Sequence, residues 1–485
     1  MADVFMRSPT KWEGSDRAGD APHATADEQS AGRYRLAIAT DRRAALAARW
    51  LALGLAALIG SGVLSVLLVL SRTPGLSELF PVADFFHVAL VAHVDLSVLV
   101  WFLAFAGVLW TLSSGPRAIG VATLAFTLAA AGTAAIALAP FLGQGRPVMA
   151  NYIPVLRDPW FLAGLVTFAA GIALLVLRSM ATAPRVGVRL DGAGALRFGL
   201  NASLVSAAVA LLAFVWSYLA VPATLDPKAY YELVFWGGGH VLQFTWTLLM
   251  LLAWLWLADA SGAHVPLSPR VVTLLFGIGL VSVFATPIIY LAYDVTSVEQ
   301  HRLLTWLMQF GGALAIPPVA LAVVWAIARS KRASADARPL RAALVASIAL
   351  FGVGGIIGFF IQGSSVKIPA HYHGCIVGVT IALMGLTYLL LPALGYARPS
   401  VRLATLQPYL YGGGQLLHVT GLVWSGGYGV QRKVAGAEQV LHTNQEIAGM
   451  GLMGLGGLIA VAGGILFVFV VLQAMWRARQ IRQAS

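Results

Sequence analysis

The sequence predicts an all-α polytopic membrane protein, a bundle of twelve transmembrane helices joined by short loops. Of its 485 residues, 59% are hydrophobic and only 11% are charged, which is far from the balance of a soluble enzyme. Twelve apolar windows are long enough to cross about 30 Å of hydrocarbon as helices. Basic residues gather in every second loop between these windows, as expected of a chain that crosses a membrane repeatedly.

The chain divides into one helical domain and two short tails. Residues 1–44 are polar and small and lack an apolar signal core, so we expect a disordered cytoplasmic tail and a first window that is retained as an anchor. Residues 45–475 form the membrane domain, and residues 476–485 form a basic cytoplasmic tail. The expected spans cover 45–71, 84–112, 117–142, 160–181, 196–222, 232–258, 270–294, 302–328, 340–363, 370–394, 406–428 and 446–475.

The charge distribution predicts the orientation of the chain. With both termini cytoplasmic, 24 of the 32 lysines and arginines face the cytoplasm and 8 face the outside. We therefore expect an integral protein of a bacterial-type inner (plasma) membrane, embedded in the lipid bilayer. The net charge of +12 follows from this topology, and no basic stripe suggests a nucleic-acid partner. The single cysteine, Cys375, excludes disulfide frameworks, iron–sulfur clusters and thiolate zinc sites.

Histidines mark the candidate site. An imidazole in hydrocarbon is costly unless it is paired or binds a metal, so histidines in apolar spans are functional candidates. At 1.5 Å per residue, five of the ten histidines lie at one depth in the outer half of the bilayer. This agreement predicts a plane of metal centres near one membrane face rather than a scatter of core histidines. The five are His93, His240, His371, His373 and His418.

His371 and His373 are the strongest pair within this layer. Two residues on an α-helix are separated by about 200°, so these side chains project from opposite faces of one helix. One helix can therefore supply axial imidazole ligands to two metal centres, one on each side. The second ligand of a six-coordinate centre is then His93 or, six residues earlier and closer to the interface, His87, for which we expect a structural role.

His240 directly follows three glycines at residues 237–239. These glycines either let a bulky group approach the helix backbone or let two helices pack tightly, and the segment favours neither interpretation. Asp95 is the clearest acid deep in a span and lies two residues after His93. Such an acid carries protons, hydrogen-bonds a cofactor substituent, or faces a polar space between helices.

Together these motifs resemble subunit I of the heme–copper oxidase superfamily over residues 45–475. A basic pair, Arg432 and Lys433, is similar to the family's paired arginines that bind heme propionates. The other motifs are the Ala-His at 92–93, the Trp-x-x-Gly-His at 236–240, the His-x-His at 371–373 and the Gly-x-x-Tyr-x-x-x-Pro at 385–392.

The resemblance implies two hemes and a distal metal. By it, His93 and His373 would ligate a low-spin heme, and His371 would be the proximal ligand of a high-spin heme. His240 would be one ligand of the distal metal, which is copper in the family, and would form the catalytic centre together with His371. We therefore expect two hemes, one low-spin and one high-spin, and leave the presence of copper open.

The copper site departs from the family pattern. The family's two adjacent helix-7 histidines would fall near residues 290–291, which are Tyr-Leu, and Phe244 replaces the tyrosine or glutamate of related enzymes. A stable copper site generally needs three or more protein ligands, so we expect low copper occupancy. His301 and His418 are candidate substitute ligands if the outer loop folds inward. The alternative for His301 is a position at the surface.

The expected function is that of a heme-binding subunit I-like protein of a respiratory terminal oxidase. Electrons would pass through a low-spin heme to a high-spin heme that reduces O₂ or NO, as in oxidoreductases of the cytochrome c oxidase or nitric oxide reductase type. The expected partners are a cytochrome c or similar electron-donating subunit and the small gas. The alternative is a heme protein without a complete copper site, acting as an electron conduit or gas-binding sensor. The His-x-His and the basic pair argue against a transporter that reuses the bundle.

Overall fold

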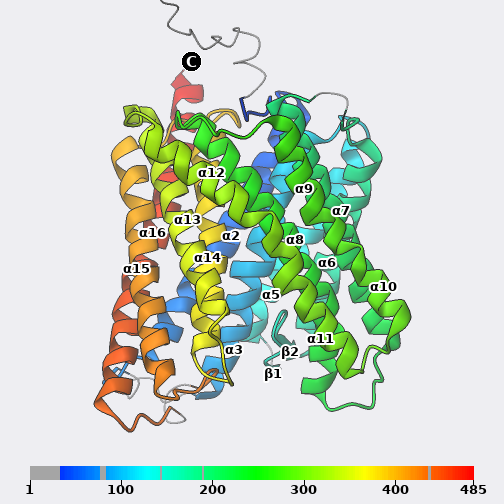
Figure 1. Cartoon of the computed structure of the whole chain (residues 1–485), viewed down its shortest axis with the longest axis vertical. Helices are drawn as coiled ribbons and strands as arrows, with labels where there is room; N and C mark the ends of the chain where they lie inside the picture. Colours follow the sequence, from blue (N-terminus) through cyan, green and yellow to red (C-terminus); the bar gives the residue numbers. More distant parts are fainter. Residues whose placement is uncertain (1–32, 77–82, 143–144, 188–189, 435–438, 485) are drawn as a thin grey trace, which may run out of the picture.

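The computed structural model describes residues 33–76, 83–142, 145–187, 190–434 and 439–484, which form a bundle of long helices (Figure 1). The first described residues and the end of the last helix lie on one side of the bundle, at the top of Figure 1, which we call the termini side. An antiparallel pair, β1 (Arg146–Val148) and β2 (Val155–Arg157), lies toward the other side, which we call the hairpin side. The α-helices are α2 (Arg42–Leu70), α3 (Ala83–Val94), α4 (Trp101–Ser113), α5 (Ile119–Leu142), α6 (Pro159–Thr182), α7 (Gly192–Ala220), α8 (Pro227–Ala260), α9 (Pro269–Val283), α10 (Ala285–Ala292), α11 (Val298–Trp306), α12 (Ile316–Arg329), α13 (Arg338–Gly358), α14 (Lys367–Leu390), α15 (Val401–Gly427) and α16 (Asn444–Ala484).

The structure confirms the all-α membrane bundle. In the described part of the chain, eleven helical rods are long and apolar enough to cross a membrane. Three of these rods consist of two α-helices in series, namely α3 with α4, α9 with α10, and α11 with α12. A π-helical turn, Asp95–Val100, joins α3 to α4, and another, Leu307–Gly311, follows α11. The twelfth expected span is α15, whose 27 residues are long enough but less apolar than the other eleven rods.

The most buried rods are the ones that carry the candidate histidines. In α8, in α14 and in the rod of α3 and α4, 89%, 78% and 67% of the most apolar segment is buried, whereas the other rods bury at most half. α8 packs against α7 on one side and against α12, α13 and α14 on others. A helix surrounded by other helices is apolar all round, as these rods are. His93, His240, His371 and His373 therefore belong to interior helices.

Capping side chains fix where many helices begin. An aspartate or serine before the first turn accepts a hydrogen bond from a backbone N–H that has no partner inside the helix. In α7, for example, a carboxylate oxygen of Asp191 accepts from the amide of Gly194 at 2.7 Å. Proline follows the cap in α6, α8 and α9, where its missing N–H costs nothing. The capping residues are Asp41 in α2, Asp158 in α6, Asp191 in α7, Asp226 in α8, Ser268 in α9 and Ser297 in α11.

The segment before α2 is packed against the bundle, although a disordered tail was expected here. Tyr34 is buried, and its hydroxyl donates to the carbonyl of Leu267 at 2.6 Å. Arg35 forms an ion pair with Asp259, near the end of α8. These two polar side chains find partners more than 200 residues away, so no local pattern reveals the contact. Residues 1–32 of the expected tail lie outside the described part of the chain.

The helical domain also extends beyond the expected range of 45–475. α2 begins at Arg42, and α16 continues to Ala484, so the expected basic tail is helical as far as that residue. Arg477 and Arg479 lie in this helical extension, beyond the expected end of the span at residue 475.

We expect Arg35→Ala to destabilise the protein more than Asp259→Asn. The first change leaves the Asp259 carboxylate, only 4% exposed, without its cation, whereas the second leaves the 54% exposed Arg35 side chain in water. A buried charged group that loses its partner costs on the order of 1–3 kcal/mol. Thermal unfolding of the purified protein in mild detergent measures the difference, with Arg33→Ala at an exposed position as the control. Equal unfolding temperatures for Arg35→Ala and Arg33→Ala would contradict this role of the ion pair.

Candidate functional site

Three of the candidate histidines lie together between α3, α14 and α15. The ring centroids of His373 and His418 are 4.8 Å apart. His93 and Arg72 are also close enough to His373 for their charges to interact. The side chain of Gln415 lies beside His373, and its Oε1 is buried without a hydrogen-bond partner among the described residues. This cluster joins histidines from helices that are distant in the sequence.

Three histidines share one mode of attachment to a neighbouring helix. The Nδ1 of His93 lies 3.1 Å from the carbonyl oxygen of Ser61 on α2, and the Nδ1 of His418 lies 3.0 Å from the carbonyl oxygen of Met453 on α16. The Nδ1 of His371 likewise lies 2.7 Å from the carbonyl oxygen of Gly354 on α13.

A backbone carbonyl only accepts hydrogen bonds, so the Nδ1 of each of these rings carries the proton. The lone pair of a neutral ring then sits on Nε2, and in the described part of the chain no hydrogen bond reaches the Nε2 of His93, His371 or His418. Imidazoles that bind a metal through Nε2 typically donate their other N–H to a carbonyl or carboxylate in this way. The free Nε2 atoms of His93, His371 and His418 therefore fit residues that would hold heme iron.

His371 and His373 face different neighbours. The ring of His371 lies against α13, where a Cβ added to Gly358 would come within 2.8 Å of the imidazole. The ring of His373 instead lies against His418 of α15. The two side chains thus leave α14 in different directions, as their spacing on the helix requires.

His240 differs from the other histidines because both of its ring nitrogens are engaged. Its Nδ1 donates to the carbonyl of Trp236 in the same helix at 2.7 Å. Its Nε2 accepts from the hydroxyl of Tyr152 at 3.0 Å. Tyr152 lies in the loop between β1 and β2, and burial of its ring raises the pKa of the phenol, which therefore stays protonated as a donor. A metal ion would have to displace Tyr152 to reach His240.

Aromatic rings of the chain itself occupy the space beside the three glycines at 237–239. A Cβ on the first glycine would lie 1.9 Å from the hydroxyl of Tyr290, and a Cβ on the second 2.4 Å from the ring of Phe214. A Cβ on the third would lie 2.2 Å from the ring of Tyr152. The glycines therefore let bulky groups approach the helix backbone, which is the first of the two interpretations considered from the sequence, and these groups are three aromatic side chains of the chain itself.

The described residues bring no copper ligand set to His240. No group of three or more histidine, cysteine, aspartate or glutamate side chains is arranged to hold a metal ion among them. Tyr290 is buried and its hydroxyl is 2.7 Å from that of Ser217, while the side chain of Leu291 is 77% exposed. The ring of His301 stacks on that of Trp236 with centroids 3.4 Å apart. His301 is thus half-buried and held by an aromatic ring rather than free at the surface.

Asp95 is completely buried, and neither of its carboxyl oxygens has a hydrogen-bond partner among the described residues. It begins the π-helical turn that follows His93. Such turns are rare and frequently occur at functional sites.

Basic side chains lie on the hairpin side of the bundle, next to the histidine cluster. Lys433 donates from Nζ to the carbonyl of Met149 at 2.6 Å, and burial, followed by the charge of Arg432, lowers its pKa to about 8. Arg72, just after α2, donates to the side chain of Gln439 at 3.2 Å, and burial lowers its pKa to about 10. Arg72 was not among the site residues predicted from the sequence, where its signal is a basic residue directly after an apolar span.

His87 occupies a structural position beside this loop. Its Nε2 donates to the carbonyl of Lys433 at 3.2 Å. The contact links α3 to the loop that precedes α16, as expected of a histidine near the interface.

A family model, two relatives and a solved structure each match most of the chain. A family model described as "Cytochrome C and Quinol oxidase polypeptide I" matches residues 45–480. An uncharacterized protein of Rickettsia prowazekii (strain Madrid E) is 28% identical over 502 residues, which cover 89% of this chain and 96% of the relative. An uncharacterized protein of Aquifex aeolicus (strain VF5) is 29% identical over 351 residues, covering 72% and 85%. A cryo-EM structure of a heme–copper terminal oxidase dimer superposes with a TM-score of 0.68 at 18% identity, covering 90% of this chain and 84% of that one.

Proposed function

Because the chain belongs to the family of cytochrome c and quinol oxidase polypeptide I, we propose that it is a two-heme membrane protein without a complete copper site. The family and the fold make it a terminal oxidase subunit I-like protein of the membrane. The observation that carries the proposal is the shared attachment of His93 and His371. In both rings Nδ1 is tied to a backbone carbonyl and Nε2 is left for another ligand.

His93 and His373 would hold a low-spin heme between α3 and α14. Their proximity supports this pairing, as does the Nδ1 bond that fixes the ring of His93. His418 would pack beside His373, because its own Nδ1 is tied to α16. The buried His418 and the partly buried His93 and His373 lie on three interior or adjacent helices, which give such a site a rigid frame.

His371 would hold the high-spin heme on the other side of α14. The carbonyl of Gly354 orients its ring and keeps the proton on Nδ1. When bound, the two hemes would supply the iron centres that carry electrons and bind a small gas such as O₂ or NO. The chain itself supplies the ligands, their orientation and an interior from which the surrounding helices exclude water.

On the distal side, Tyr152 and His240 would replace the copper site. The Tyr152 phenol donates to Nε2 of His240, so the pair can offer a hydrogen bond or a proton but not an open metal position. This observation favours the second candidate function, a heme protein that conducts electrons or senses a gas. Reduction of O₂ or NO remains the first candidate, with a cytochrome c or similar subunit as the electron donor.

Arg72, Arg432 and Lys433 would pair with heme propionates at the hairpin side. Arg72 is close enough to His373 for their charges to interact, and Arg72 and Arg432 both lie near Tyr372, which supports this role. The proposed orientation places this side outside a bacterial-type inner membrane and both termini in the cytoplasm, as the basic residues of the loops favour.

Metal analysis of the purified full-length protein tests the proposal. We expect two hemes per chain and substoichiometric copper. Tyr152→Phe should leave the copper content low, because freeing one nitrogen of His240 still provides a single imidazole, and a stable copper site generally needs three or more ligands. One copper per chain in the wild type would contradict the proposal that His240 holds no copper. A single heme per chain would contradict the proposal that His371 and His373 hold two different hemes on opposite sides of α14.

If His93 and His373 hold the low-spin heme, replacing either one should change the absorption spectrum. His93→Ala and His373→Ala should each abolish the sharp visible band of the reduced low-spin heme, because each removes one axial ligand. His87→Ala is the control, since the ring of His87 already bonds the carbonyl of Lys433. The absorption spectrum of the dithionite-reduced protein is the measurement, normalised to protein yield. Retention of the band in both variants would refute this assignment.

If His371 holds the high-spin heme, alanine substitutions at two glycines of α13 should affect carbon monoxide binding differently. A Cβ on Gly358 would lie 2.8 Å from the ring of His371, whereas a Cβ on Gly355 would meet nothing within 4 Å. Gly358→Ala should therefore displace the ring and weaken the carbon monoxide difference signal of the reduced protein. Gly355→Ala should preserve it, and both variants should keep the low-spin band. Equal signals in the two variants would exclude His371 as the ligand of the gas-binding heme.

A further inference from the structure

A cavity of about 340 Å³ lies on the termini side of the bundle, at the end remote from β1 and β2. The segment before α2, the end of α4, and the helices α7 and α8 contribute its wall. Leu36, Leu112 and Trp256 give the wall an apolar part, and Arg43 and Arg197 give it a basic part. In the described part of the chain, no acidic side chain lines the cavity.

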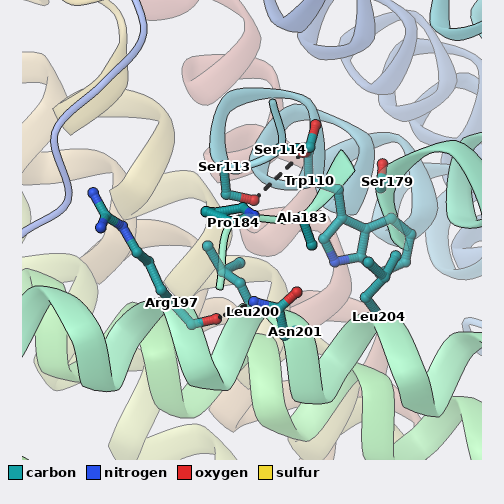
Figure 2. Close-up of a pocket in the computed structure, with 10 residues that line it drawn as sticks. All are labelled: Trp110, Ser113, Ser114, Ser179, Ala183, Pro184, Arg197, Leu200, Asn201 and Leu204. Atoms are coloured by element: carbon teal, nitrogen blue, oxygen red, sulfur yellow. Dashed lines mark hydrogen bonds between the residues drawn. The ribbon is translucent and has the colours of Figure 1, made fainter. Parts of the chain in front are cut away.

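A small hollow of about 10 Å³ adjoins this cavity and shares part of its wall (Figure 2). Ser113, Ser114 and Arg197 line both spaces. The hollow is also lined by Ser179, whose hydroxyl is buried without a hydrogen-bond partner among the described residues. Hydroxyls and guanidinium groups are the side-chain donors that bind phosphate oxygens. The two spaces thus form a continuous polar edge on an otherwise apolar cavity.

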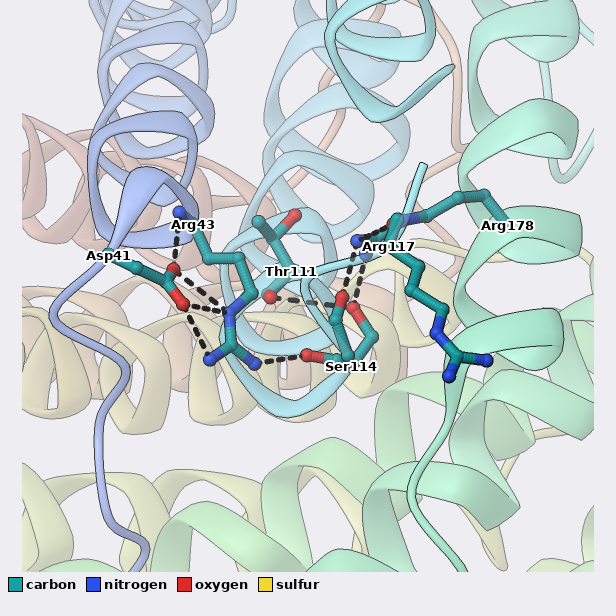
Figure 3. Close-up of polar contacts among 7 residues, drawn as sticks. Asp41, Arg43, Thr111, Ser114, Arg117 and Arg178 are labelled. Carbon is teal, nitrogen blue, oxygen red and sulfur yellow. Dashed lines mark hydrogen bonds and ion pairs between the residues drawn. The ribbon is translucent and has the colours of Figure 1, made fainter. Parts of the chain in front are cut away.

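The basic groups around this edge outnumber the acidic ones. Arg43 pairs with Asp41, with Nη2 and the carboxylate 2.9 Å apart, and also donates to the carbonyl of Ser114 (Figure 3). Arg178 reaches the same turn from α6 and donates to the carbonyls of residues 115 and 117 at 2.6 and 2.8 Å. Arg178 and Arg43 are close enough to repel one another. One carboxylate therefore faces several guanidinium groups.

Two features leave this positive charge uncompensated. Arg178 is 4% exposed, and its Nε is buried without a partner among the described residues. Its carbonyl partners hold the turn after α4 but carry no negative charge. No hydrogen bond or ion pair from the guanidinium of Arg197 occurs within the described residues, and this side chain lines the cavity. A buried cation such as Arg178 is costly without a counterion, and the partly buried Arg197 beside it has no partner among the described residues, so the site favours an anion.

We propose that this cavity binds the phosphate group of an anionic phospholipid. The phosphate would contact Arg197 and Arg43, and the glycerol and first methylenes would lie against Leu112 and Trp256. Basic pockets between membrane helices on the cytoplasmic side bind lipid headgroups by this combination of charge and apolar contact. An inorganic phosphate ion offers the same charge without the apolar contact.

The test uses the full-length protein, delipidated in a neutral detergent. Phosphatidylglycerol should raise its thermal unfolding temperature in a saturable manner, whereas phosphatidylcholine should not. Arg197→Gln should weaken the apparent affinity for phosphatidylglycerol by about tenfold or more, because it removes a charged hydrogen bond. Arg197→Lys should restore part of the affinity. Arg270→Gln is the matched control, since it removes an equal charge at an exposed position on the same side.

Three results would overturn the proposed phospholipid site at Arg197. Equal affinities in Arg197→Gln and Arg270→Gln would overturn the site, and so would equal protection by the neutral lipid. If sodium phosphate protects the wild type as well as phosphatidylglycerol does, and Arg197→Gln abolishes that protection, the occupant is a free anion and the lipid assignment is overturned. Arg197 makes no side-chain hydrogen bond within the described residues, so its substitution should leave the fold intact. The unfolding temperature without lipid checks this directly.

Discussion

Close contact between helix backbones, made possible by glycine, is the constraint on which the histidine layer depends. An imidazole N–H in hydrocarbon has no water to bond, so it needs an acceptor from the protein. His371 reaches the carbonyl of Gly354 because α13 approaches α14 so closely that a Cβ on Gly354 would clash with the α14 backbone. His418 reaches the carbonyl of Met453 across an equally close contact, where a Cβ on Gly456 would lie 2.2 Å from the amide nitrogen of His418.

The same requirement gives a different result at His240. Its N–H is satisfied within its own helix, by the carbonyl of Trp236, so no neighbouring helix is needed to orient the ring. The other nitrogen is then satisfied by Tyr152, which arrives from a loop, packs against Gly239 and closes the position that a metal would take. Ring orientation by a carbonyl is thus shared by His93, His240, His371 and His418, whereas an Nε2 that is free among the described residues distinguishes the other three from His240.

Periodicity and apolar length were sufficient to predict the helical bundle and the divergence of His371 from His373, whereas the shared depth of the five histidines stays a prediction. Those features depend on helix geometry and on the cost of polar groups in hydrocarbon, which act locally along the chain. The contribution of Tyr152 was missed, because a loop residue reaches the site through tertiary packing that leaves no period in the sequence. The same holds for Arg72 and for Tyr34, whose partners lie hundreds of residues away.

The docked segment before α2 has a consequence for how the protein is made. Arg35 emerges from the ribosome 224 residues before Asp259, and Tyr34 emerges 233 residues before Leu267. Six of the helical rods are therefore synthesised before this segment can reach its final place. Without this segment in place, the end of α8 lacks the counterion of a buried carboxylate. A segment that is translated before the first helix thus reaches its place only after α8 has been made.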